Sequence, residues 1–320
     1  MPRGLAAAAL LLLAACARPD VAGPAAAAPP QPGYTDLSQA FVDFWDRTRN
    51  LDEDARLAAF KREIVPLYPA FYAPRDGATQ EKWDQRAKRQ IADFPKIRDR
   101  YIAVQAAFPA AYASAREHFA RYFPGSDAAL PTYVLHSLGE MDGGTRQLDG
   151  RNVMVFGADG MALYHTPKDI GVFFDHELFH VEHGAYFAEC ETVWCALWTE
   201  GLATAASEKM NPGASLKDLM LETPRPIAPE VDAAWAEALC FVAARLDSTE
   251  RDDYRNLFMG GTEGQRFPPR WGYYIGYRLA QRTLAHHSIQ QLAHMPAAQA
   301  EPLLRTTLSQ MTAEAGPCHP

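Results

Sequence analysis

The chain has 320 residues, 48% of them hydrophobic, which is enough to bury a sizeable core in one large domain or two closely packed ones. Its formal net charge is −8, and no basic run longer than a couple of residues occurs, so we expect no nucleic-acid partner. The acidic balance suits a soluble protein but says nothing about its substrate.

Residues 1–16 are predicted to be a signal peptide rather than part of the fold. Arg3 supplies a positive charge, and the apolar run that follows it is too short to span a bilayer comfortably. The run ends in Leu13-Ala14-Ala15-Cys16, which resembles the lipobox of bacterial lipoproteins. The resemblance implies that Cys16 carries a lipid and, because Ala17 follows, that the protein is anchored in the outer membrane of the cell envelope, facing the periplasm. The alternative is an ordinary secretory signal with an incidental cysteine.

Residues 17–33 are rich in proline, alanine and glycine and contain no aromatic residue. Such a segment cannot bury enough apolar surface to offset the entropy of ordering it. We therefore expect a flexible tether between the lipid anchor and the folded part.

Four further cysteines, Cys190, Cys195, Cys240 and Cys318, can form up to two disulfides in an oxidising periplasm, or they can remain buried thiols. The sequence does not give the pairing. Cys190 and Cys195 can be joined only if they do not both lie on one unbroken helix.

Residues 34–125 are predicted to form a helical N-terminal region. Thr35 or Asp36 is a suitable N-cap, and aromatic residues follow at helical spacing. Pro95 and Pro109 punctuate the later helices. The aromatic residues are interpreted as a core stripe rather than a pocket lining.

The character of the sequence changes near residue 125, where a second region, residues 126–320, is predicted to begin. Runs rich in β-formers, separated by Gly and Asp-Gly turns, predict strands at 132–138 and 152–156. These strands belong to a small sheet. His136 lies in the first of them and is interpreted as a structural residue rather than a metal ligand.

A predicted helix over residues 167–187 carries the strongest chemical signal. Thr166 is a good N-cap, and Pro167 suits the first helical position. His176 and His180 are about 40° apart around the axis, so both imidazoles project from one face. Zinc binds neutral imidazole nitrogens at about 2 Å, and this spacing delivers two of them.

A catalytic zinc also needs a base and a third protein ligand. Glu177 directly follows the first histidine, where it can take a proton from a water that zinc activates. His183 lies roughly 10 Å of helical rise from His176, too far to share one ion easily. Glu200, on a second predicted helix, lies among small and apolar residues, where zinc would satisfy its charge. The alternative for Glu200 is a salt-bridged helix glutamate.

His-Glu-x-x-His on one helix, with a glutamate twenty residues later on the next, resembles the gluzincin metallopeptidases. This resemblance covers residues 132 to about 285. It implies three zinc ligands and one general base, namely His176, His180 and Glu200 as ligands and Glu177 as the base.

The family's aspartate four residues after the ligand glutamate, which orients a histidine, is Thr204 here. Asp175 or Glu182 is the candidate to replace it.

The segment PPRWGYYIGYRLAQ, residues 268–281, resembles the C-terminal signature of a little-characterised family of predicted zinc-dependent proteases. Gly272 and Gly276 allow close approach of another helix. Tyr273 is the first candidate, and Tyr277 the second, for a phenol that stabilises an oxyanion beside the zinc. The alternative is a helix whose aromatic residues serve packing alone.

The sequence therefore predicts an α+β, mostly helical, zincin-like fold with a small sheet beside the active-site helix. Residues 126–320 are predicted to be its zincin-like catalytic region. It predicts a Zn²⁺-dependent peptidase that acts on peptide or protein substrates. Two alternatives stay open, a lipid-anchored binding or scaffold protein with a non-catalytic zincin fold and a hydrolase of another amide, as in cell-wall peptides. The intact Glu177 argues against the first, because a purely structural site needs no base.

Overall fold

The computed structural model describes residues 33–318 except 76, 127–129, 189 and 261–263. The expected signal peptide with Cys16, and all of the expected tether but Gly33, lie outside the described residues. Within the described ranges, no helix has the length and apolar character needed to cross a membrane.

The fold is mostly helical with one small sheet, which confirms the predicted α+β class. The strands are β1 (Thr35–Asp36), β2 (Thr132–Leu135), β3 (Gly143–Leu148) and β4 (Arg151–Gly157). The helices before the sheet are α1 (Ser38–Thr48), α2 (Glu53–Glu63), η1 (Val65–Leu67), α3 (Pro69–Tyr72), α4 (Gln80–Asp93), η2 (Phe94–Lys96) and α5 (Arg98–Tyr122). Those after it are α6 (Ala158–Tyr164), α7 (Ile170–Gly184), α8 (Val193–Met210), α9 (Ala228–Ala233), α10 (Trp235–Ala243), α11 (Arg251–Phe258), α12 (Trp271–Leu284), α13 (Ile289–Ala293) and α14 (Ala297–Ala315).

The N-terminal helices enclose an aromatic core, as predicted, but two local details differ from the prediction. Thr35 and Asp36 form a short strand instead of capping a helix, although the Asp36 carboxylate still accepts the Ser38 N–H at 2.8 Å. Pro109 lies inside α5 and does not end it. The buried side chains of Phe108 and Tyr112 on that helix account for the continuation, because their packing outweighs the lost backbone hydrogen bond.

The sheet has the order β1-β2-β4-β3, with β1, β2 and β4 parallel and β3 antiparallel to β4. The β3–β4 hairpin turns at Asp149 and Gly150, whose φ angles of 51° and 73° suit a two-residue hairpin turn. The strand predicted over 132–138 ends at Leu135, because the chain turns there and Leu138 takes a positive φ of 57°. Strand β3 was not predicted.

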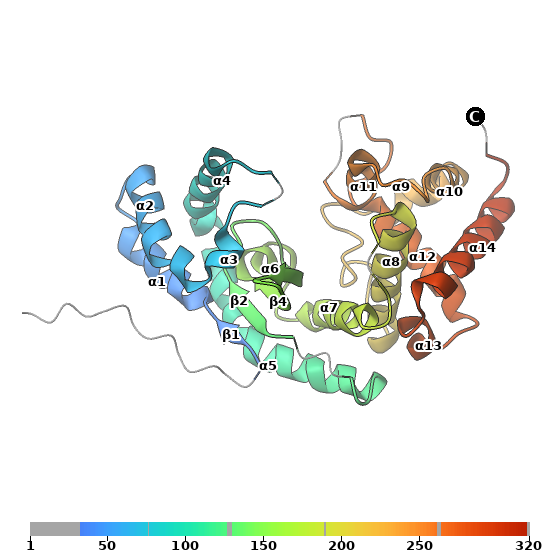
Figure 1. Cartoon of the computed structure of the whole chain (residues 1–320), viewed down its shortest axis with the longest axis horizontal. Helices are drawn as coiled ribbons and strands as arrows, with labels where there is room; N and C mark the ends of the chain where they lie inside the picture. The colour runs from blue at the N-terminus through green and yellow to red at the C-terminus, as the bar shows by residue number, and fades with distance from the viewer. Residues whose placement is uncertain (1–32, 76, 127–129, 189, 261–263, 319–320) are drawn as a thin grey trace, which may run out of the picture.

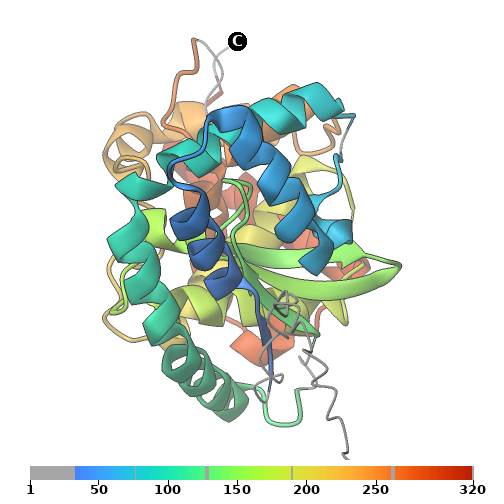
Figure 2. The same cartoon turned by 90° about the vertical axis from the view of Figure 1, so that its left-hand side faces the viewer.

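Helix α7 lies between the N-terminal and C-terminal halves of the molecule, where it contacts α5, α8 and β3 (Figure 1). Seen from the N-terminal side, α1 and α2 lie in front and the C-terminal helices lie behind (Figure 2). Buried apolar residues of both halves form one continuous cluster. The molecule therefore holds α7 from both sides.

Helix α7 starts later than the predicted residue 167. The Thr166 N–H donates to the Asp169 carboxylate at 2.6 Å, and the Thr166 carbonyl accepts the Ile170 N–H at 3.1 Å. The capping residues thus form one turn that precedes the regular helix, which runs from Ile170 to Gly184.

Helices α7 and α8 pack antiparallel, and α12 packs closely on the other side of α8. The Ser207 hydroxyl of α8 donates to the Val172 carbonyl near the start of α7 at 2.6 Å. A Cβ atom on Gly276 of α12 would lie 2.5 Å from the Leu197 carbonyl oxygen, and one on Gly201 would lie 2.2 Å from the Gly276 carbonyl carbon. Only glycine fits at this crossing, as predicted for Gly276.

Gly276→Ala should lower the free energy of unfolding by about 2 kcal/mol or more, because the added methyl group meets backbone atoms that cannot move aside. The matched control is Gly171→Ala in α7, where an added Cβ meets nothing within 4 Å. That change should stabilise the protein by about 0.5–1 kcal/mol through helix propensity. Unfolding curves of both variants test this, and equal effects would contradict the close approach of α8 and α12.

Candidate metal centre

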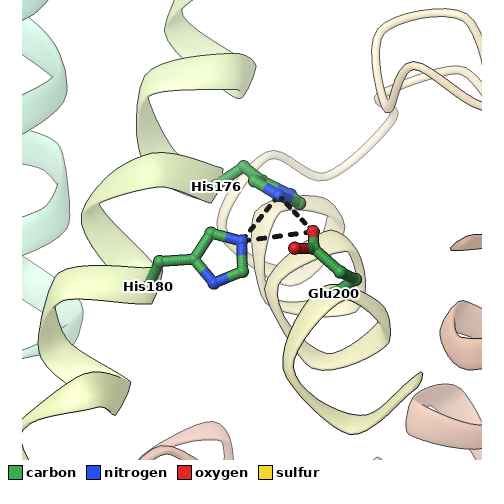
Figure 3. Close-up of side chains that lie close together, drawn as sticks. All are labelled: His176, His180 and Glu200. Carbon is green, nitrogen blue, oxygen red and sulfur yellow. Dashed lines mark hydrogen bonds and ion pairs between the residues drawn. The ribbon is translucent and has the colours of Figure 1, made fainter. Parts of the chain in front are cut away.

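His176 and His180 lie one turn apart on α7 and project toward α8 (Figure 3). Their Nε2 atoms are 3.0 Å apart. The helical spacing i, i+4 brings the two rings to one face, as the sequence predicts. Two ring nitrogens at this distance need a proton or a metal ion between them, because their lone pairs otherwise repel.

Glu200 completes the group from α8. Its Oε2 atom is 3.4 Å from His176 Nε2 and 3.3 Å from His180 Nε2. Atoms about 2.1 Å from a tetrahedral zinc lie roughly 3.4 Å from one another, so the three atoms fit the corners of one face of such a site. Three protein ligands leave the fourth position open, as in catalytic zinc sites. Among the described residues, no other group of three or more potential ligands converges in this way.

The electrostatics of the three residues favour a positive charge at their centre. Burial alone would lower the pKa of His180, but the Glu200 carboxylate raises it to about 9. Burial also works against ionisation of Glu200, yet the charge of His180 and the hydrogen bonds from both histidines hold the pKa of that carboxyl far below its usual range. A metal cation supplies the positive charge that this arrangement favours.

Glu177 lies beside the three residues and is almost fully buried, with 8% of its surface exposed. Burial raises its pKa to about 8, and the nearby Asp142 and Glu200 carboxylates act in the same direction. A Cβ atom on Gly144 of β3 would lie 3.8 Å from Glu177 Oε2, so the carboxylate faces that strand. Glu177 therefore lies between the candidate ligands and the edge of the sheet.

A large cleft of about 1830 Å³ runs along α7 and contains all four residues. One wall comes from β3 and the loop before it, and the other from α8, the start of α11 and the start of α12. The volume of the cleft is nearly twice the upper limit for ordinary small-molecule pockets, which is about 1,000 Å³.

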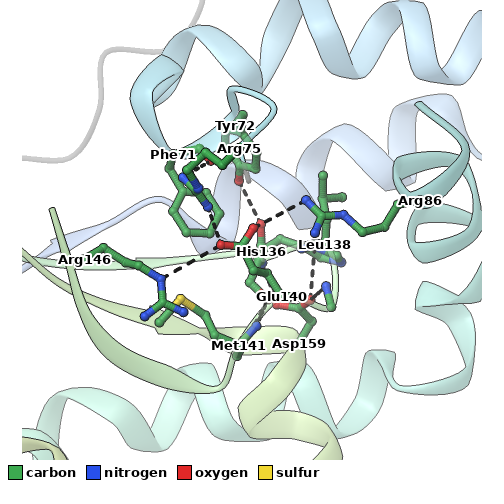
Figure 4. Close-up of polar contacts among 12 residues, drawn as sticks. Phe71, Tyr72, Arg75, Arg86, His136, Leu138, Glu140, Met141, Arg146 and Asp159 are labelled. Carbon is green, nitrogen blue, oxygen red and sulfur yellow. Dashed lines mark hydrogen bonds and ion pairs between the residues drawn. The ribbon is translucent and has the colours of Figure 1, made fainter. Parts of the chain in front are cut away.

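The loop before β3 is held in place by polar contacts with α6 and with the N-terminal region (Figure 4). The Asp159 carboxylate accepts the N–H groups of Ser137 and Gly139 at 2.6 and 2.7 Å. Glu140 forms ion pairs with Arg75 and Arg86. The N-terminal helices thus fix one wall of the cleft.

The structure brings only one of the two candidate tyrosines to the cleft. Tyr273 lines it, and burial together with the Glu200 carboxylate raises the pKa of its phenol well above the usual value. Tyr277 is not among the lining residues, and its hydroxyl donates to Glu208 at 2.8 Å. The phenol of Tyr273 is therefore a neutral donor facing the cleft.

Asp175 or Glu182 was predicted to orient one of the candidate histidine ligands, but both carboxylates bind other residues. The Asp175 carboxylate lies 2.9 Å from His118 and accepts the Asn211 side-chain N–H at 2.7 Å. Glu182 pairs with His294 at 2.7 Å. Each carboxylate instead links α7 to another element.

Thr204, His136 and His183 do not belong to the group of candidate metal ligands. Thr204 donates its hydroxyl to the Glu200 carbonyl at 2.8 Å and so stays within α8. His136 is buried, and its Nδ1 accepts the Leu138 N–H at 3.1 Å, which fits a structural role. His183 is buried against the Ala293 carbonyl at 2.7 Å and lies outside the ligand group.

Arg146, Tyr254 and Arg270 also line the cleft, and no sequence pattern singled them out as candidates. Arg270 directly precedes the Trp-Gly-Tyr run of α12, which was the only signal that could have singled it out. Arg146 and Tyr254 lie in segments with no distinctive pattern. Their proximity to the site results from tertiary packing.

The four cysteines form two disulfides, Cys190–Cys195 and Cys240–Cys318. Cys190 precedes α8 and Cys195 lies in its first turn, so the condition that both not share one helix is met. This bridge lies at the rim of the cleft, five residues before Glu200.

One comparison with known proteins gives a match. The family described as "Predicted Zn-dependent protease (DUF2268)" matches residues 117–305, more than half of the chain. The matched part includes all three candidate ligands, Glu177 and Tyr273. No curated protein and no solved structure gives a significant match.

The purified protein should contain about one zinc per chain by elemental mass spectrometry, because three ligand atoms meet at tetrahedral spacing. His176→Ala and Glu200→Ala should each lose most of this zinc. His286→Ala, which removes an exposed histidine outside the ligand group, should keep it. Equal zinc content in all four proteins would place the metal elsewhere.

Proposed function

Since the chain belongs to the family of predicted Zn-dependent proteases (DUF2268), we propose that it is a peptidase whose zinc is held by His176, His180 and Glu200. The observation that carries the proposal is the convergence of these three side chains in a large cleft, with Glu177 directly beside them. When bound, zinc supplies a Lewis acid that lowers the pKa of a water and polarises a carbonyl group.

Glu177 is the general base of the proposed reaction. The charge of a bound zinc would favour the ionised form of Glu177 and oppose the effect of burial on its pKa. Its carboxylate takes a proton from the attacking water and returns it to the leaving amine, so one residue serves both steps. Its place next to His176 and opposite Gly144 puts it on the side of the cleft where β3 runs. A purely structural metal site has no need of a carboxylate in this position.

The free edge of β3 supports a peptide as the substrate. Within the described residues β3 pairs only with β4, and most of its residues line the cleft. An extended peptide can add to such an edge through backbone hydrogen bonds. This arrangement favours a peptide segment over a small amide.

Tyr273 is the proposed donor to the oxyanion. Its hydroxyl makes no hydrogen bond to any described residue, and burial keeps the phenol protonated by raising its pKa. Donors aimed at the developing oxyanion stabilise the transition state. Tyr277 receives no such support, because its hydroxyl is bound to Glu208.

Glu177→Gln should keep its zinc and lose peptidase activity by about 10²–10⁴-fold, because the amide cannot accept the proton. Cleavage of a defined peptide mixture, followed by mass spectrometry, measures this. Glu191→Gln is the matched control, since Glu191 is an exposed glutamate that lines the same cleft. A Glu177→Gln protein as active as the wild type would contradict the role of Glu177 as the general base. A wild-type protein that binds zinc but cleaves nothing would favour the scaffold alternative.

We also propose that residues 1–16 direct the protein to the outer membrane, with a lipid on Cys16 and residues 17–33 as the tether. The two disulfides support an oxidising compartment such as the periplasm.

Cys16→Ser should prevent lipidation, because serine lacks the thiol that carries the lipid. In a bacterial host the wild type should fractionate with the membranes, and the variant should not. Cys240→Ser, which leaves the lipobox intact, is the control. Equal membrane association of wild type and Cys16→Ser would contradict the anchor.

A further inference from the structure

Arg270 takes a backbone conformation that is unfavourable for a residue with a side chain. Its φ of 67° and ψ of 17° lie in the left-handed region, where glycine is usual. Its N–H donates to the Met259 carbonyl at 3.2 Å, and its carbonyl accepts the Tyr273 N–H at 3.1 Å. Two backbone hydrogen bonds therefore hold residue 270 in this conformation. An arginine in a conformation that favours glycine points to a role for its side chain.

The guanidinium of Arg270 lies over the ring of Tyr273, with its central carbon 4.6 Å from the ring centroid. Both side chains are half-buried and line the cleft. The guanidinium forms no hydrogen bond or ion pair with any described residue. The cation–π contact orients the planar group and leaves its N–H donors free for a ligand.

The Arg270 charge lies near the candidate metal ligands. Arg270 lines the same cleft as His176, His180 and Glu200, and so does Tyr273 beneath its guanidinium. A ligand group bound by Arg270 would therefore lie in the cleft that holds the candidate metal ligands.

Two acidic residues of the cleft, Glu140 and Asp142, already have other partners. Glu140 pairs with Arg75 and Arg86 (Figure 4), and Asp142 binds His165 at 3.1 Å. Arg146 donates to the Thr145 carbonyl at 2.9 Å and lies 4.0 Å from Glu140. Arg270 is thus a half-buried cation with no hydrogen bond or ion pair to any described residue.

We propose that Arg270, held against Tyr273, forms a subsite that binds a carboxylate of the substrate. A guanidinium matches a carboxylate with two parallel hydrogen bonds, which makes this the anion that it recognises best in a peptide. The carboxylate comes either from the C-terminus of the peptide or from an acidic side chain near the scissile bond. The subsite rests on the proposed peptidase function for its substrate class, and it determines which peptides bind.

The test measures peptide binding separately from cleavage. The full-length, zinc-loaded Glu177→Gln protein is titrated with short peptides, each made as a C-terminal acid and a C-terminal amide, and each with Glu or Gln inside. Removing one of the two carboxylates should weaken binding by about 10- to 100-fold, the usual effect of losing a charge-assisted hydrogen bond. Adding Arg270→Gln or Arg270→Gly should abolish this preference.

Two controls separate the subsite from misfolding and from general charge effects. Arg270→Gly should fold at least as stably as the parent, because glycine accepts the left-handed conformation. Arg251→Gln removes an exposed arginine from the same cleft and should keep the preference.

In the wild-type background, Tyr273→Phe should lower kcat for acid and amide peptides alike and keep the binding preference, because the ring remains.

Each outcome bears on a different claim. Equal binding of all four peptide forms, acid and amide with Glu or Gln, or a preference that survives Arg270→Gln, would overturn the subsite. A preference for the carboxylate in a protein whose wild type cleaves nothing would uphold the subsite and overturn the peptidase function. Cleavage without any preference would uphold the peptidase function and overturn the subsite. A peptide set that does not bind at all would overturn both the subsite and the peptidase function.

Discussion

Two imidazole nitrogens and a carboxylate oxygen are held within 3.4 Å of one another by two antiparallel helices. Such atoms repel unless a cation lies among them, so the packing of α7 against α8 must hold the arrangement. Helix α12 fixes α8 from behind through the contact of Gly201 with Gly276, and α5 and β3 hold α7 from the other side. The other residues that line the cleft are arranged around this pair of helices.

The same packing explains why residues far apart in sequence share the cleft. Gly201 directly follows Glu200, and Tyr273 lies one turn before Gly276, so the close crossing of α8 and α12 brings the tyrosine toward the candidate ligand Glu200. On the opposite wall, Asp159 and Glu140 fix the loop that leads into β3. The N-terminal helices therefore contribute to the site by supporting its wall rather than by supplying ligands.

The sequence predicted what depends on local spacing. His176, Glu177 and His180 could be placed because a helix fixes the relation between i and i+4. Strand β3 was missed because its residues, GGTRQL, line a cleft and lack the alternating apolar pattern of a half-buried strand. The place of Arg270 in the cleft, and that of Tyr277 outside it, also required the structure, since only tertiary packing decides which residues near the start of α12 line the cleft. The start of α7 differed by three residues because its capping turn precedes the regular helix.

The central claim is that His176, His180 and Glu200 bind one zinc ion together. Crystals of the purified protein, measured with anomalous scattering at the zinc absorption edge, test it most directly. A single strong peak is expected about 2 Å from both Nε2 atoms and from a Glu200 carboxylate oxygen. A peak elsewhere in the cleft, for instance beside Glu182 and His294, or no peak in a protein purified with zinc, would contradict it.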